Sequence, residues 1–108
     1  MAVLAIVRGK GITRAMYEAL RKEVAWESSN PPGAIFHAAA FDDRGDLHAA
    51  DVWESAELMN EFFAKRLLPS MQTLDIPPPE VEVHAVVNVN AYKGVQKYVL
   101  TERLWMKP

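Results

Sequence analysis

The sequence has 108 residues, half of them hydrophobic and about a quarter charged, with no cysteine and a net charge of −2. This length suits one domain, which buries roughly 60–70% of its unfolded surface and so forms a core without covalent staples. The lack of cysteine excludes disulfides, thiolate metal sites and a cysteine nucleophile, and the small net charge gives no reason to expect nucleic acid or an anionic membrane as a partner.

The N-terminal segment 1–7 is a short apolar run, which is typical of a strand covered on both faces. The basic residues Arg8 and Lys10 follow this run, whereas a signal peptide carries them before it, and the run is too short to span a membrane. We therefore expect a cytoplasmic protein. Thr13 is then a candidate N-cap for an amphipathic helix over 14–26, in which apolar residues recur at helical spacing.

The segment 34–53 predicts a β-hairpin. An apolar run over 34–41, interrupted only by His37, is followed by the turn-forming sequence 42–46 and by a return strand over 47–53. Gly45 stands at the third position of the loop, where a left-handed residue closes a type I turn with a bulge. This turn sets Asp42 opposite Asp46, and it therefore sets His37 opposite Asp51.

The second half of the chain predicts another helix and a last strand. Ser55 caps a helix over Ala56–Leu68, which Pro69 kinks or ends, with a further helical turn over 70–74. After a stiff proline-rich connector, the last strand is expected over 81–91. We divide the chain into a domain over residues 1–93 and a C-terminal extension over 94–108, which we interpret as a fifth strand that reaches onto a partner subunit, in preference to a loose tail.

The order strand, helix, strand, strand, helix, strand is that of an α+β, ferredoxin-like βαββαβ fold with a four-stranded antiparallel sheet. Both crossover helices must cover the same face of the sheet. The other face should then show regular polar positions, yet the first three strands are apolar on both sides. A second copy of the chain is the simplest cover for such a surface, so we expect a homodimer formed through the sheet face.

The junction 51–57, with the sequence Asp-Val-Trp-Glu-Ser-Ala-Glu, followed by Phe62-Phe63 and by 66–69, resembles the dimeric α/β-barrel superfamily. The branch it resembles most is that of the antibiotic-biosynthesis-monooxygenase-like proteins. The resemblance implies a dimeric α/β barrel with a ligand between the sheet and the helices. It also implies cofactor-independent monooxygenase-like chemistry on a hydrophobic or aromatic substrate as one activity among several in the superfamily.

His37 and Asp51 are the candidate catalytic residues. A carboxylate beside an imidazole fixes its tautomer and raises its basicity, which suits a general base. The competing interpretation is a buried polar pair that only fixes the hairpin. Trp53 shares their face and is either core or a flat wall for a ring substrate. The other candidate ligand-binding residues are Tyr17, Phe62 and Asn88.

Cofactor and metal sites are not expected. The three histidines show no HxH or HExxH spacing. The haem-degrading branch, which the chain resembles at Trp53, uses a histidine on the second helix and an asparagine on the first strand, and both are missing here. Three functions stay open: an enzyme with His37 as base, a non-catalytic binder of a hydrophobic metabolite, and a structural dimer whose pocket is filled by its own side chains.

Overall fold

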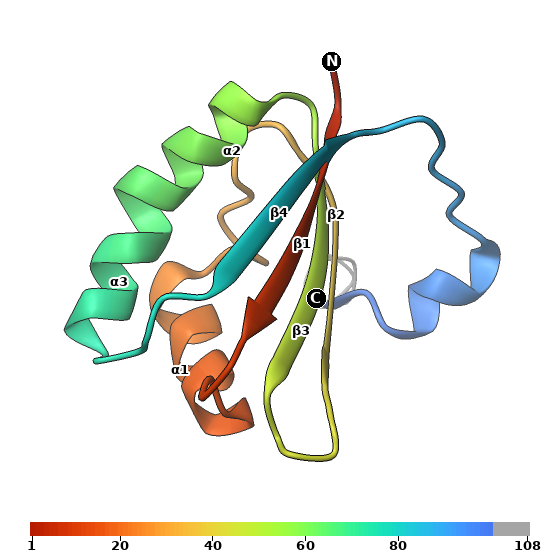
Figure 1. Cartoon of the computed structure of the whole chain (residues 1–108). Coiled ribbons are helices and arrows are strands. Elements are labelled where there is room, and N and C mark those ends of the chain that lie inside the picture. Colours follow the sequence, from red (N-terminus) through yellow and green to blue (C-terminus); the bar gives the residue numbers. More distant parts are fainter. Residues whose placement is uncertain (101–108) are drawn as a thin grey trace.

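The structure, a computed structural model, describes residues 1–100. One antiparallel sheet packs against a layer of helices (Figure 1). The strands lie in the order β2-β3-β1-β4, which confirms the predicted ferredoxin-like α+β fold. The elements are β1 (Val3–Gly9), α1 (Arg14–Val24), β2 (Ala34–Phe41), β3 (Leu47–Trp53), α2 (Ala56–Phe62), a π-helical segment (Phe63–Leu67), α3 (Leu68–Thr73), β4 (Glu80–Ala85) and a 3-10 helix (Lys93–Lys97).

Both ends of α1 are capped. The Thr13 side chain accepts a hydrogen bond from the Met16 amide at 3.2 Å, as its predicted N-cap role requires. At the other end Ala25 is left-handed, and its amide donates to the Arg21 carbonyl. The helix therefore ends at Val24, two residues before the predicted end at Trp26, because a left-handed residue cannot continue it.

The turn between β2 and β3 has the expected geometry. Gly45 has a φ of 84°, and the Asp42 amide donates to the Asp46 carbonyl at 3.0 Å. The Asp42 carboxylate also accepts from the amides of Arg44 and Asp46. This turn fixes the register in which His37 lies opposite Asp51, so the predicted pairing is confirmed.

The second helical region is one rod with a wider π turn in its middle (Figure 1). The Leu68 amide bonds to the Phe63 carbonyl, five residues back. The ring of Pro69 would clash with the carbonyl four residues before it in a regular α-helix, and the π turn enlarges the helix at this point. Pro69 thus perturbs the helix as predicted, and the helix continues to Thr73.

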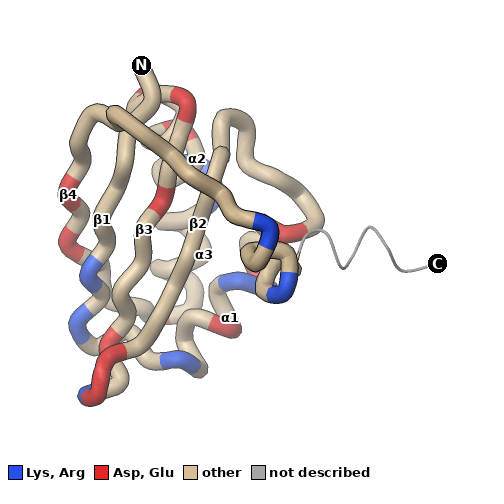
Figure 2. Tube along the Cα trace, turned by 90° about the vertical axis from the view of Figure 1, so that its right-hand side faces the viewer, with Lys and Arg blue, Asp and Glu red and all other residues tan. Residues whose placement is uncertain are grey.

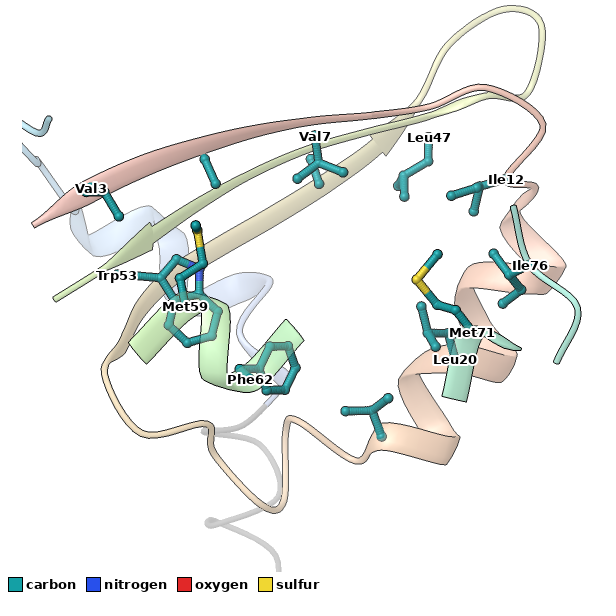
Figure 3. Packing of buried hydrophobic residues seen from close by; sticks show 13 residues of the cluster. Val3, Val7, Ile12, Leu20, Leu47, Trp53, Met59, Phe62, Met71 and Ile76 are labelled. Carbon is teal, nitrogen blue, oxygen red and sulfur yellow. The ribbon is translucent and has the colours of Figure 1, made fainter. Parts of the chain in front are cut away.

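The core fills the space between the helices and one face of the sheet (Figure 3). β1 alternates buried and less buried residues, with Val3, Ala5 and Val7 facing the helices. Trp53, Met59 and Phe62 lie together at one end of this core, and Leu20, Met71 and Ile76 lie at the other. None of the helices within residues 1–100 has the length and apolarity needed to cross a bilayer.

The last strand is shorter than predicted. β4 ends at Ala85, opposite Val3 of β1, and one more bond joins the Val86 amide to the Ala2 carbonyl. β1 begins at Val3, and residues 86–91, which lie beyond its paired end, do not form a strand in spite of their alternating pattern. The fifth strand predicted in the extension is absent from residues 94–100, which begin as a 3-10 helix; the apolar cluster 104–106 lies outside the described residues.

Replacing Gly33 tests the contact between the start of β2 and α2. Gly33 has a φ of 85°, and a Cβ there would lie 2.6 Å from Leu58 Cδ1. Gly45 has a similar φ, but nothing lies within 4 Å of its would-be Cβ. A left-handed alanine costs about 1–2 kcal/mol, so Gly45→Ala should lower the free energy of unfolding by about that amount. Gly33→Ala should cost roughly 1–3 kcal/mol more through overpacking, as measured by urea denaturation. Equal losses in the two variants would contradict this packing.

Candidate functional site

Three side chains form a hydrogen-bonded chain between the sheet and α1. Asp51 Oδ1 lies 2.5 Å from His37 Nδ1, and His37 Nε2 lies 2.8 Å from the Tyr17 hydroxyl. An ionised carboxylate only accepts hydrogen bonds, so Nδ1 carries a hydrogen atom and donates a hydrogen bond to Asp51 Oδ1. In the neutral imidazole Nε2 then accepts, and the Tyr17 hydroxyl donates to it.

Backbone geometry brings these residues together from three elements. The hairpin register sets His37 on β2 beside Asp51 on β3, with both side chains on the face that α1 covers. Tyr17 lies in the first turns of α1, whose start is fixed by Thr13. The structure therefore joins three of the predicted site residues, two from the catalytic set and one from the ligand-binding set.

Aromatic rings contact one side of the partly exposed imidazole. The Trp26 ring meets His37 edge-on at a centroid distance of 5.6 Å and lies 5.7 Å from the Tyr17 ring. Phe41 lies on the same face of β2 as His37, and its ring meets the Tyr17 ring edge-on at a centroid distance of 5.8 Å. These rings give the polar chain apolar walls, and such walls strengthen hydrogen bonds by lowering the local dielectric constant.

Burial falls along the chain from Asp51 to His37. The Asp51 side chain is 13% exposed and the His37 side chain 37% exposed. Burial raises the pKa of Tyr17 well above its usual range, and the nearby charge of Glu27 adds to this, while Arg21 opposes it. Burial also raises the pKa of Glu27. The Tyr17 phenol therefore keeps its proton at neutral pH and remains a hydrogen-bond donor.

Arg66 holds the segment that follows α1. Its guanidinium donates to the carbonyls of Val24 and Ser29 at 3.0 and 2.7 Å and lies over the Phe62 ring. This segment carries Trp26 and Glu27. Neither Glu27 nor Arg66 stands out in the sequence as a site residue, because no local pattern shows that a residue in a π turn reaches the end of another helix.

The remaining predicted ligand-binding residues lie elsewhere. Trp53 is 4% exposed and Phe62 8% exposed, and their rings pack at 5.4 Å within the core (Figure 3). The indole N–H of Trp53 is buried there without a hydrogen-bond partner among the described residues. Asn88 is exposed in the segment after β4, which leaves the opposite edge of the sheet from β2.

The other two histidines pair with acids on the sheet face that turns away from the helices. His48 Nε2 lies 2.8 Å from Asp42 Oδ2, and His84 Nε2 lies 3.0 Å from Glu82 Oε2. Within residues 1–100, no three side chains of His, Asp or Glu gather closely enough to hold a metal ion.

The raised pKa of Tyr17 predicts an alkaline loss of stability. Above pH 10 the phenol ionises in the unfolded chain but stays protonated in the fold, so the unfolded state loses protons first and stability falls. Between roughly pH 10 and 12, the free energy of unfolding of the wild type should therefore fall more steeply than that of Tyr17→Phe, by up to about 1 kcal/mol per pH unit. Urea denaturation at each pH measures the difference, and parallel curves for the two proteins would contradict the burial of this phenol.

Comparison with known proteins gives a likeness in structure only. No family model matches the sequence, and no curated protein matches it. SnoaB, a cofactor-independent oxygenase from Streptomyces nogalater, is 17% identical, with a TM-score of 0.60 over 82% of this chain and 95% of its own. Rv0793 from Mycobacterium tuberculosis is also 17% identical, with a TM-score of 0.57 over 83% of this chain and 97% of its own.

A third structure comes from Nitrosomonas europaea and is provisionally named an antibiotic biosynthesis monooxygenase. It is 15% identical, with a TM-score of 0.62 over 80% of this chain and 90% of its own. Identities this low establish a shared architecture and no shared activity. The chain therefore has the ferredoxin-like fold of the antibiotic-biosynthesis-monooxygenase-like proteins.

Proposed function

We propose that this protein is a small-molecule enzyme that oxidises a hydrophobic aromatic substrate without a cofactor, with His37 as its base. The observation that carries the proposal is the hydrogen-bonded chain of Asp51, His37 and Tyr17. A chain of three polar side chains is more than a hairpin needs, because a carboxylate–imidazole pair alone satisfies the buried Asp51.

The chemistry needs a base and an oxidant. Removal of a proton from a hydroxylated ring gives an electron-rich anion that reacts with dioxygen directly. One oxygen atom enters the ring as a carbonyl and the other leaves as water, so the substrate itself supplies all the electrons. Asp51 stabilises the imidazolium that forms when His37 takes the proton, as carboxylates do beside catalytic histidines.

The fold comparison supports this class of reaction. SnoaB, a neighbour in structure, is named as a cofactor-independent oxygenase. The likeness makes such chemistry a reasonable activity for this scaffold, while the residues that would perform it here are those of the Asp51–His37–Tyr17 chain.

A non-catalytic dimer is the competing function, and one observation favours it. Trp53 and Phe62 pack into the core between the helices and the sheet. Side chains thus occupy part of the space in which the superfamily resemblance implies a ligand. An enzyme of this kind needs its substrate to enter beside Tyr17 and His37. Otherwise the side chains of Trp53 and Phe62 must move to make room for it.

Oxidation of 1-naphthol tests the proposal. Its conversion by one dioxygen to 1,4-naphthoquinone and water is followed by quinone absorbance and oxygen uptake, with no flavin, haem or metal added. His37→Ala and Asp51→Asn should each lower turnover by about 10²-fold or more, because general base catalysis contributes about that much. The control is His48→Gln, which breaks an exposed histidine–carboxylate pair instead. Unchanged turnover in folded His37→Ala would exclude His37 as the base.

We also propose that the protein forms a homodimer through the sheet face opposite the helices, here called the open face. Figure 2 shows that β2 carries no charged residue and that charges gather near β4 and the hairpin end. Mostly apolar residues, among them Ile6, Ala38 and Ala50, line a shallow hollow of about 260 Å³ on this face, together with His48. Phe36 of β2 is 37% exposed. A second copy would cover this apolar surface, and at about 25 cal/mol per Å² such cover favours association.

A charge on the open face should separate the copies. In a two-fold dimer each substitution enters the interface twice, so Ala38→Arg buries two unpaired guanidinium groups and should shift the protein to monomer. Sedimentation velocity at micromolar concentration measures the change. Ala19→Arg, at an exposed position of α1, is the matched control. A wild-type monomer at this concentration would overturn the proposed assembly.

A further inference from the structure

We propose that Tyr17 is the residue that touches the substrate, and that His37 and Asp51 act through it on a neutral aromatic molecule with a phenolic or enolic hydroxyl. This inference rests on the proposed function, and it changes the role of Tyr17 from a ligand contact to the proton-transferring group.

The hydrogen bonds leave His37 with no free nitrogen. Nδ1 is held by Asp51 at 2.5 Å and Nε2 by the Tyr17 hydroxyl at 2.8 Å. A base that contacts its substrate directly needs one ring nitrogen within hydrogen-bond reach of the proton it removes. A substrate that approached Nε2 would first have to displace the phenol, at the cost of an unpaired polar group beside the ring of Trp26.

The phenol oxygen can receive a proton as it gives one away. Its O–H donates to Nε2, so its lone pairs stay available to a second partner. In the proposed step the substrate O–H bond breaks and a new O–H bond forms at Tyr17. At the same time the original Tyr17 O–H bond breaks and an N–H bond forms at Nε2. The products are a substrate anion and an imidazolium held by Asp51, and atoms and charges balance.

The surroundings of Tyr17 suit a relay of this kind. Burial and the charge of Glu27 raise its pKa, against the opposing charge of Arg21, and this disfavours a free tyrosinate as an intermediate of the relay. The partly buried carboxylate of Glu27 also lies 3.5 Å from Arg21 Nε, and Arg21 forms a second ion pair with Glu18. Arg21 pairs with both carboxylates and offsets one of their charges, and the Trp26 ring offers an apolar surface to an aromatic substrate.

The experiment uses 4-nitrophenol, which turns yellow when it loses its proton, with the full-length protein. The titration is done below the pKa of the free probe, where the unbound molecule is mostly protonated. Wild type should raise the phenolate absorbance in a saturable way. Tyr17→Phe, His37→Gln and Asp51→Asn should each lose that signal. The matched controls Tyr92→Phe, at an exposed tyrosine, and His48→Gln should keep it. Circular dichroism shows that each variant is folded.

The outcomes distinguish proton transfer through Tyr17 from direct proton removal by His37. Loss of the signal in all three variants supports the relay. If His37→Gln and Asp51→Asn lose the signal but Tyr17→Phe keeps it, His37 contacts the hydroxyl directly, so the relay is overturned and the proposed base stands. If all three variants keep the signal, both the relay and the base are overturned. A wild-type protein that gives no phenolate signal overturns the relay.

Discussion

The pairing register of β2 and β3 is the constraint on which the candidate site depends. Side chains alternate between the two faces of a strand, so a shift of one residue would send His37 to the opposite face from Asp51. The register is fixed far from the site, where Gly45 adopts a left-handed conformation and the Asp42 side chain binds two amides of the turn. A conformation at one end of the hairpin thus determines which groups meet near its other end.

Burial of Asp51 explains why the neighbouring elements are arranged as they are. A carboxylate in a mostly apolar layer needs partners, because desolvation of an unpaired charge costs several kcal/mol. His37 supplies the partner, and its second nitrogen is in turn satisfied by Tyr17. Each polar group in the chain is therefore paired with the next, and the last member lies where α1 meets the edge strand of the sheet. Asp51 is buried, His37 is partly exposed and Tyr17 is partly buried, so the polar chain lies along the boundary between the core and the surface.

The sequence predicted the fold and the central pair for physical reasons that act locally. Caps, turn residues and alternating apolar positions determine the hairpin and the start of each helix, and all of these are short-range patterns. The failures have a different origin. The last strand was predicted to reach residue 91 from its alternation, but a strand also needs a partner, and β1 begins only at Val3. Arg66 reaches the C-terminal end of α1 through tertiary contacts, which no spacing in the sequence encodes, and Glu27 pairs with Arg21 across the irregular end of that helix. The sequence around Trp53 fits both a core residue and a pocket wall, and the structure packs Trp53 within the core.

The hydrogen bonds from Arg66 to the carbonyls of Val24 and Ser29 affect how the helices can move relative to the sheet. It ties the end of α1 and the Trp26 segment to the second helical rod, so these parts belong to one layer, whereas His37 and Asp51 both belong to the sheet. A small sliding of the helical layer over the sheet would leave the bond between His37 and Asp51 unchanged. The same movement would lengthen or shorten the bond between His37 and Tyr17, which is the joint between the two layers. The length of the hydrogen bond between His37 and Tyr17 thus depends on how the two layers are aligned.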